Sequence, residues 1–307
     1  LGIAGEWGCG KSALASAMAL PARAPLYVKS GTMELDGDVL DLKTQIKAPV
    51  NWHGIKVALL PQRALNSLNP TAKIGSFVVD VVRAHDRSIK PDQAIKMAHE
   101  RLEQLSLPSR VLDSYPHQLS GGMRQRVVAV VSTLLNPSLL IADEPTSALD
   151  VSSQKQLVWL LRQLLDKGFI KRIAFITHDL PMLSNIADRI AVMYAGKLIE
   201  IGDTRQIVES PRHPYTHALI SSTLDPDPEV RNKRLQGISG APPDLRWPPS
   251  ACRFHPRCPL VMDICSKEDP PVVGEKDDFA LCWWVQEQQA KRVANKGAGE
   301  QLQKEAR

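Results

Sequence analysis

Residues 5–12 read Gly5-Glu6-Trp7-Gly8-Cys9-Gly10-Lys11-Ser12 and fit the pattern G-x-x-x-x-G-K-[ST] of a glycine-rich phosphate loop. A short apolar strand, Leu1-Gly2-Ile3-Ala4, precedes the loop, and a run of good helix formers from Ala13 to Ala19 follows it. The pattern requires this context, because loop N–H groups and a helix N-terminus then face one anion. We predict that Lys11 contacts the β- and γ-phosphates of a nucleotide and that the Ser12 hydroxyl ligates Mg²⁺.

Two acidic residues end the apolar run Leu139-Leu140-Ile141-Ala142, which is typical of a central parallel strand buried on both faces. Ligands of such sheets bind at the carboxyl ends of strands, so Asp143 is expected to hold Mg²⁺, directly or through water. Glu144 is expected to polarise the water that attacks the γ-phosphate. Alone, the pair would indicate a solvated acidic turn, but together with the phosphate loop it predicts a nucleotide-hydrolysing site.

Residues 119–126 read Leu-Ser-Gly-Gly-Met-Arg-Gln-Arg and resemble the signature of ABC ATPases. Ser120 is a favourable N-cap, and Gly121 and Gly122 expose backbone amides at the start of a helix. This is a second anion site in the chain, and one nucleotide cannot easily use both. The resemblance implies that the signature of one subunit closes on the phosphate loop of another, with two ATP molecules held in a head-to-tail dimer.

Three further segments follow in the order of that family. Gln62 resembles the glutamine that touches Mg²⁺ and senses the γ-phosphate. Asp150 ends a segment, Ser147-Ala148-Leu149-Asp150, that resembles the loop crossing the dimer interface, and His178 matches the switch histidine. The resemblance therefore implies these roles: nucleotide binding by Gly5, Gly8, Cys9, Gly10, Lys11, Ser12, Ala13, Gln62, Ser120, Gly121, Gly122 and Asp150; catalysis by Glu144, His178 and Lys11; Mg²⁺ binding by Ser12, Gln62 and Asp143.

The resemblance implies an α/β fold of the P-loop NTPase class, with a mostly parallel sheet, a helical subdomain and a small cysteine-rich C-terminal extension. We expect the ATPase domain over residues 1–210, including the helical subdomain over about residues 63–135. The extension is expected over 211–285 and a disordered tail over 286–307. Because Leu1 is not Met and begins a strand that should have neighbours, we expect the natural N-terminus, with the family's adenine-stacking aromatic residue, to precede it.

Three segments narrow the resemblance to the dipeptide/oligopeptide (peptide/nickel) importer group: Leu65-Asn66-Ser67-Leu68-Asn69-Pro70, Tyr115-Pro116-His117-Gln118 and Ser210-Pro211-Arg212-His213-Pro214-Tyr215-Thr216. The resemblance implies ATP-driven import of peptides, with nickel or another small solute as the alternative. It also implies two transmembrane permease subunits, a second ATPase subunit (a paralogue) and, indirectly, an extracytoplasmic substrate-binding protein. The chain is then expected on the cytoplasmic side of the cell (inner) membrane, as a peripheral subunit.

Four of the five cysteines, Cys252, Cys258, Cys265 and Cys282, follow a proline-rich stretch near the end of the chain. In a reducing compartment such a group favours a metal over disulfides. Its spacing is neither the paired C-x-x-C of a zinc ribbon nor that of ferredoxins. Members of the importer group resemble residues 252–259 and the final Cys-Trp, and some carry a [4Fe–4S] cluster. We therefore predict that cluster, with structural zinc and no metal as alternatives.

Composition bears on the remaining function classes. The formal net charge is +5, but the last 17 residues hold five Lys/Arg and two Glu, which leaves +2 for the rest; with 5% aromatic residues, no nucleic-acid partner is predicted. No apolar run reaches the length that spans a bilayer, and no secretory signal is recognised. Three alternatives stay open: a soluble ABC ATPase in DNA repair or translation, a redox-sensing module with a degenerate ATPase, and an exporter.

Overall fold

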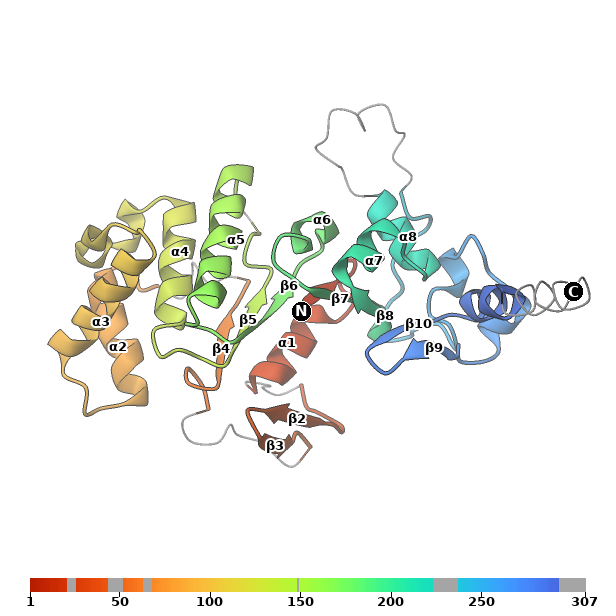
Figure 1. The fold of residues 1–307 in the computed structure, drawn as a ribbon, viewed down its shortest axis with the longest axis horizontal. Coiled ribbons are helices and arrows are strands. Elements are labelled where there is room, and N and C mark those ends of the chain that lie inside the picture. The colour runs from red at the N-terminus through yellow and green to blue at the C-terminus, as the bar shows by residue number, and fades with distance from the viewer. Residues whose placement is uncertain (21–25, 44–51, 63–67, 148, 223–236, 293–307) are drawn as a thin grey trace, which may run out of the picture. The chain divides into compact units, whose positions relative to one another are not determined.

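The computed structural model describes residues 1–20, 26–43, 52–62, 68–147, 149–222 and 237–292 (Figure 1). The chain divides into two compact units. The first contains Leu1 and Ser12–Thr177, and the second contains Gly2–Lys11 and His178–Arg307. The boundary therefore passes through the glycine-rich loop motif, between its lysine and its serine.

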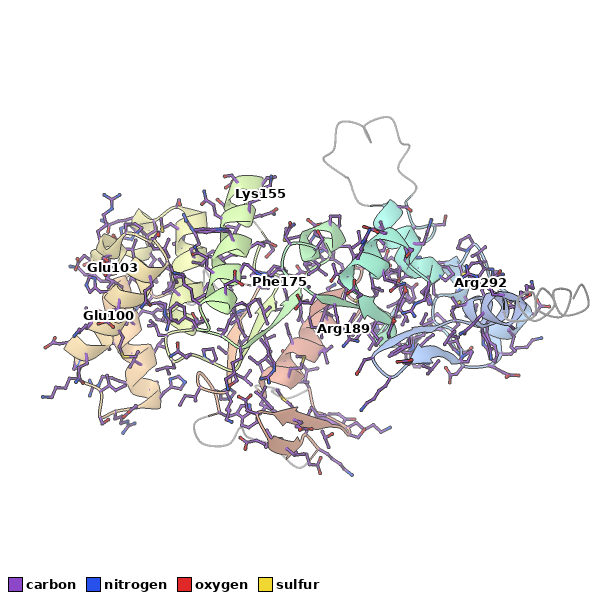
Figure 2. All side chains as sticks on the ribbon, in the orientation of Figure 1. Glu100, Glu103, Lys155, Phe175, Arg189 and Arg292 are labelled. Atoms are coloured by element: carbon purple, nitrogen blue, oxygen red, sulfur yellow. The ribbon has the colours of Figure 1, made fainter. Side chains whose placement is uncertain are left out.

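Three parallel strands form the centre of the first unit: β4 (Val57–Leu60), β5 (Leu139–Asp143) and β6 (Arg172–Ile176). β5 lies between the other two, with Ala142 opposite Leu60 on one side and Phe175 on the other. Every residue of β5 is buried, which confirms the prediction of a central strand covered on both faces. The carboxyl ends of the three strands consequently share one edge. Phe175, labelled in Figure 2, is fully buried on β6.

Two helices of the first unit follow the glycine-rich loop and the Asp150 loop. α1 (Lys11–Ala19) follows the glycine-rich loop, and α5 (Val151–Asp166) buries five apolar residues at helical spacing. The first unit also contains a small antiparallel hairpin of β2 (Thr32–Leu35) and β3 (Asp38–Asp41). The turn that joins these two strands is at residues 36–37, both of which have positive φ.

The expected helical subdomain contains α2 (Ile74–His85), α3 (Pro91–Gln104), the 3-10 helices η2 (Ser109–Asp113) and η3 (Pro116–Gln118), and α4 (Gly121–Ser132). The outward face of α3 carries Glu100 and Glu103, labelled in Figure 2, while Ala98 and Leu102 are buried. Residues 63–67, which begin the expected subdomain and include part of the Leu65–Pro70 motif, lie outside the described residues.

The second unit is built on a mixed set of strands. β1 (Gly2–Ala4) pairs in parallel with β7 (Arg189–Tyr194), and β7 pairs antiparallel with β8 (Lys197–Asp203). Two strands from the expected extension, β10 (Asp278–Leu281) and β9 (Val272–Glu275), continue this order antiparallel from β8. The extension therefore shares backbone hydrogen bonds with a strand that the sequence assigns to the ATPase domain.

The second unit also holds the remaining helices. They are α6 (Leu180–Leu183), α7 (Thr204–Glu209), α8 (Pro214–Ser221), the 3-10 helices η5 (His255–Arg257) and η6 (Asp263–Ser266), and a helix over residues 283–292. This last helix corrects the expectation of disorder for residues 286–292, because Val285 anchors it in a small apolar cluster with Val273 and Ala280. Residues 293–307 lie outside the described residues.

A membrane-spanning helix would need at least eighteen residues of sustained apolar character, and none of the helices in the described ranges meets that requirement.

Candidate nucleotide site

The glycine-rich loop follows β1 and lies against β7. A Cβ at Gly5 would overlap the carbonyl oxygen of Met193, so only glycine permits this close approach. Gly8 has φ 77°, and no atom lies within 4 Å of the position of its Cβ. The loop therefore has a tightly packed base and an open side, as a cradle for phosphates requires.

Lys11 begins α1, and its side chain turns back over the loop. The buried ammonium donates to the carbonyl oxygen of Gly5 at 2.7 Å and to that of Glu6 at 3.0 Å. Carbonyl oxygens are weaker partners for an ammonium than phosphate oxygens, since hydrogen bonds between ions are the stronger class. The lysine is thus held inside the loop by contacts that a triphosphate can replace.

Cys9 is buried under the loop and not exposed at its open side. Its Sγ lies 3.8 Å from the Lys11 ammonium, and its carbonyl accepts from the N–H of Gly196. Burial raises the pKa of the Cys9 thiol, although the nearby lysine opposes that shift. The Cys9 thiol therefore packs in the base of the cradle. Any contact of Cys9 with phosphate would be made by its backbone.

His178 lies beside the loop within the second unit. Its ring centroid is 5.8 Å from that of Trp7, and the two planes are tilted by 45°. Trp7 is 63% exposed, so the pair stands at the surface of the loop. This contact supports the expected position of His178 near the phosphates. The sequence singled out His178 but not Trp7, whose position within the motif accepts any residue.

Two of the three expected magnesium ligands, Ser12 and Asp143, are neighbours in the first unit. The Ser12 hydroxyl donates to Oδ1 of Asp143 at 3.2 Å, and Asp143 ends the buried strand β5. Adjacent ligands of an octahedral Mg²⁺, at about 2.1 Å from the metal, lie about 3 Å from each other. The two oxygens are therefore spaced as a magnesium site requires, and both belong to the oxygen class that this cation prefers.

Glu144 has a strained backbone. Its φ is 44°, a left-handed value that is uncommon for residues other than glycine, and its N–H donates to the carbonyl oxygen of Ile176. Its buried carboxylate accepts from Nε2 of Gln62 at 3.0 Å. Such strain persists only where the surroundings impose it, and it is concentrated at functional sites. Gln62 is thus paired with the expected catalytic carboxylate, a contact that the sequence did not reveal.

The signature begins α4 as predicted. Ser120 is the N-cap, and its hydroxyl accepts from the N–H of Met123 at 3.2 Å. Gly122 is packed so closely that a Cβ there would lie 2.6 Å from Oγ of Ser153, near the start of α5. Asp150 is the N-cap of α5, and hydrogen bonds from Ser152 and Ser153 lower its pKa. The signature and the Asp150 loop therefore meet at two helix N-termini; Ala148 lies outside the described residues.

The His-Pro-Tyr motif positions a buried tyrosine. The carboxylate of Glu200, on β8, accepts from the backbone N–H groups of Arg212 and His213 at 2.8 and 3.0 Å. His213 then accepts from the N–H of Tyr215 through Nδ1, and burial lowers the pKa of His213 to about 3, which keeps it neutral. The Tyr215 hydroxyl accepts from the N–H of Glu6 at 2.8 Å. The motif thus reaches the glycine-rich loop.

The four C-terminal cysteines are gathered in one part of the second unit. The N–H of Cys252 donates to the carbonyl oxygen of Cys265 at 3.1 Å. Burial, together with the charges of the neighbouring cysteines, raises the pKa of Cys258 and of Cys282 to about 11. All four are free thiols. Within the described ranges, no three or more His, Cys, Asp or Glu side chains are arranged to hold a metal ion.

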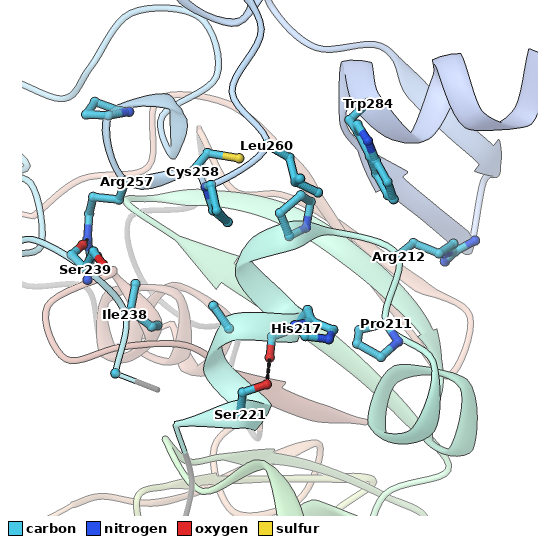
Figure 3. A pocket seen from close by; sticks show the side chains of 15 residues that line it. Pro211, Arg212, His217, Ser221, Ile238, Ser239, Arg257, Cys258, Leu260 and Trp284 are labelled. Carbon is cyan, nitrogen blue, oxygen red and sulfur yellow. Dashed lines mark hydrogen bonds between the residues drawn. The ribbon is translucent and has the colours of Figure 1, made fainter. Parts of the chain in front are cut away.

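A cavity of about 710 Å³ lies next to Cys258 (Figure 3). It is bounded by α8 on one side and by the loop around Cys258 on the other, with Leu260 and Trp284 among its apolar walls. Arg257 also lines it.

Two family models match the chain. Residues 1–147 match the family model "ABC transporter", and residues 199–265 match "Oligopeptide/dipeptide transporter, C-terminal region". Two solved dimers of an ATP-binding cassette, one of them bound to ADP and phosphate, align with TM-scores of 0.55 and 0.54 at 23% and 24% identity. Each alignment covers 66% of this chain and 84% of the other, and supports the ABC ATPase fold.

Curated relatives align over most of the chain. The dipeptide transport ATP-binding protein DppD of Caldanaerobacter subterraneus is 42% identical, with 87% of this chain and 81% of that protein covered. The oligopeptide transport ATP-binding protein OppD of Bacillus subtilis is 40% identical (95% and 82% covered), and DppD of Escherichia coli is 38% identical (88% and 82%). At this identity and coverage, the chain belongs to the dipeptide and oligopeptide transport group of ABC transporter ATP-binding proteins.

Proposed function

We propose that this chain binds MgATP on residues 5–12 and hydrolyses it to drive the import of di- and oligopeptides. The observation that carries the proposal is the open glycine cradle with the Lys11 ammonium held by two exchangeable carbonyl contacts. The chain's family supports ATP hydrolysis, and the names of its dipeptide and oligopeptide transport relatives support peptides as the cargo.

The phosphates are bound by the backbone N–H groups of the loop and by the N-terminus of α1. Lys11 exchanges its loop carbonyls for β- and γ-phosphate oxygens. Ser12 and Asp143 would hold Mg²⁺, with Gln62 as the third expected ligand. The ion would supply positive charge that neutralises the phosphates. His178 stabilises charge that develops on the γ-phosphate. Backbone contacts from Gly5, Gly8, Cys9, Gly10 and Ala13 orient the triphosphate.

Glu144 prepares the attacking water. Its carboxylate accepts a hydrogen bond from Gln62, whose amide would orient the carboxylate as γ-phosphate enters. Glu144 aligns a water for in-line attack and takes its proton, while ADP leaves with the bond to the γ-phosphorus broken. The strained φ of Glu144 fixes the carboxylate directly after β5, so little reorganisation is needed at the moment of reaction.

Two chains are required for a complete site. Ser120, Gly121 and Gly122 present backbone amides at a helix N-terminus with no lysine beside them, which suits the γ-phosphate of a nucleotide bound to another subunit. Asp150, next to the signature, would lie at the same interface. The head-to-tail pair of subunits closes when ATP binds and opens after hydrolysis. Each state then favours one conformation of the attached permease subunits. We assign the partner to a paralogous ATPase subunit.

The remaining partners follow from the proposed transport. Two permease subunits form the membrane path, and a substrate-binding protein on the outer side delivers the peptide. The chain itself acts as a peripheral subunit on the cytoplasmic side of the cell membrane. No nucleic acid takes part.

Peptide import is tested by transport in proteoliposomes that contain the full-length subunit with its permeases and substrate-binding protein. We expect di- or oligopeptides to raise ATP hydrolysis at least about fivefold and to accumulate inside, because cargo and ATPase states are coupled. Nickel ions serve as the competing cargo. Stimulation and uptake with nickel but not with any peptide would replace peptide import by the alternative cargo, while ATP hydrolysis without any permease requirement would favour a soluble ATPase.

We also propose a [4Fe–4S] cluster on Cys252, Cys258, Cys265 and Cys282. Four thiols within electrostatic reach of one another support it, because thiolates are the ligands of such clusters. In the described residues the four thiols are not arranged around one metal ion, and structural zinc and no metal are the alternatives to the cluster. The cluster would act as a rigid cross-link in an extension with a small apolar core.

The cluster is tested by the visible spectrum of anaerobically purified protein. We expect a broad absorbance at about 400 nm, with four iron and four sulfide per chain. Cys265→Ser should lose at least half of it, and Cys9→Ser, which changes the one cysteine outside the group, should retain it. A colourless protein that contains zinc, or no metal, would contradict the cluster.

A further inference from the structure

Glu6, in the glycine-rich loop, is held by residues near the other end of the chain. Its carboxylate forms a two-point pair with the Arg257 guanidinium, with Nη1–Oε2 at 2.7 Å and Nη2–Oε1 at 3.0 Å. Its N–H donates to the Tyr215 hydroxyl, and its carbonyl oxygen accepts from the Lys11 ammonium. Every polar group of Glu6 therefore has a partner, and two of these partners come from the region after β8.

The pair is largely withdrawn from water. The side chain of Arg257 is 6% exposed and that of Glu6 is 19% exposed. Two-point pairs of this kind have defined geometry as well as strength, in contrast to surface ion pairs. The pairing with Glu6 raises the pKa of Arg257, so the guanidinium stays charged at any physiological pH.

Arg257 is itself fixed from several sides. Its Nε donates to the carbonyl oxygen of Ser239 at 2.8 Å, and its Nη1 also contacts the Tyr194 hydroxyl at 3.2 Å. Figure 3 shows its side chain extending toward Ser239 while the sulfur of the next residue, Cys258, points elsewhere. The arginine is therefore a fixed link between the cysteine-bearing loop and Glu6.

An aromatic cluster supports the second contact. The Tyr215 ring lies 4.6 Å from that of Tyr194 and 5.3 Å from that of Phe254, centroid to centroid, and all three are buried. Phe254 belongs to the same loop as Arg257. One face of this loop thus packs against the residue whose hydroxyl holds the Glu6 backbone, so the two contacts with Glu6 are coupled through packing.

We propose that Arg257 is a positioning residue for ATP binding: it fixes Glu6 and cancels the negative charge that Glu6 would otherwise present beside the triphosphate. The inference rests on the proposed binding of phosphates to residues 5–12. A carboxylate without its partner repels a triphosphate strongly where water is partly excluded, because charges interact more strongly at lower effective dielectric constant. The C-terminal extension thereby contributes directly to the affinity of the glycine-rich loop for nucleotide.

The first test is the steady-state kinetics of Arg257→Gln in the full-length subunit, assembled with its partner ATPase subunit and its permeases. We expect KM for ATP to rise about tenfold and kcat to stay within about twofold, since the change affects binding and not the hydrolytic water. Arg257→Lys keeps the charge but not the two-point geometry and should recover about half of the loss on a logarithmic scale. Thermal unfolding of each variant shows whether it is folded.

A second change separates charge from packing. Glu6→Gln removes the repelling carboxylate, so the double variant with Arg257→Gln should bring KM back to within about threefold of the wild type. The defect of Arg257→Gln should also shrink relative to wild type as salt rises from about 0.05 to about 0.5 M, because salt screens repulsion between charges. A purely structural role for Arg257 predicts neither effect.

The matched control is Arg246→Gln. Arg246 also forms an arginine–carboxylate pair in the extension, with Asp244 at 2.6 Å, but its side chain is 83% exposed and the pair does not reach the loop. The KM of the Arg246→Gln variant for ATP should equal that of the wild type. If wild type and control bind ATP while Arg257→Gln has an unchanged KM, or the double variant is worse than either single one, this inference is wrong. If wild type itself binds no ATP, the proposed function fails instead.

Discussion

Replacing Glu144 by glutamine is expected to lower kcat for ATP hydrolysis about a thousandfold, the usual range for loss of a general base, while ATP affinity stays within about twofold. Glutamine has nearly the same shape, and its amide oxygen can still accept the hydrogen bond that Gln62 gives to Glu144. What it lacks is the negative charge that orients a water and accepts its proton. The variant should therefore bind MgATP and remain in the closed dimer.

Phosphate release and size-exclusion chromatography with ATP measure the two halves of this expectation. The matched control is Glu209→Gln, which changes an exposed glutamate at the end of α7 that is paired with Arg205. This variant should hydrolyse ATP at the wild-type rate. Undiminished phosphate release by Glu144→Gln would remove Glu144 from its role and leave the strained backbone at this residue without a catalytic explanation.

Lys11→Ala is expected to weaken ATP binding about a hundredfold. The substitution removes an ammonium whose charged hydrogen bonds to phosphate are each worth roughly 1.5–3 kcal/mol, and about 1.4 kcal/mol corresponds to a tenfold change in Kd. It also leaves the carbonyl oxygens of Gly5 and Glu6 without the donor they now share. The loop should consequently lose part of its order as well as its charge.

Isothermal titration with ATP and Mg²⁺ measures this loss directly. Lys171→Ala is the control, because Lys171 is an exposed lysine paired with Asp36 and should leave Kd unchanged. A Kd for Lys11→Ala equal to that of the wild type would contradict the assignment of residues 5–12 as the phosphate site. A loss of affinity shared by both variants would indicate a general effect of charge.

Local patterns predicted much of the fold. The apolar run 139–142 was predicted as a buried central strand and forms β5, since uninterrupted β-branched and aliphatic residues suit a position covered on both faces. Ser120 was predicted as an N-cap, and its hydroxyl accepts the expected hydrogen bond from the N–H of Met123. This interaction was predictable because it spans only three residues. The family and its ABC ATPase fold were likewise predicted, and the comparisons confirm both.

Contacts between distant segments were not predictable in the same way. Arg257 and Glu6 are 251 residues apart, and neither shows a local pattern that selects the other. The hydrogen bond from Gln62 to Glu144 depends on the register of β4 and β5, which a single sequence does not specify. The helix over residues 283–292 was missed because its polar composition resembles a solvated tail, while one buried valine anchors it.

A structure of the full-length Glu144→Gln subunit with MgATP would examine the nucleotide site most directly. We expect the triphosphate on Gly5–Ser12, the Lys11 ammonium against the β- and γ-phosphates, and the Ser120–Gly122 edge of a second ATPase subunit across the γ-phosphate. Two results at saturating MgATP would contradict the assignment of this chain as the ATP-driven motor of a transporter. One is a nucleotide bound elsewhere, and the other is a Lys11 ammonium that still contacts the carbonyl oxygens of Gly5 and Glu6 instead of phosphate.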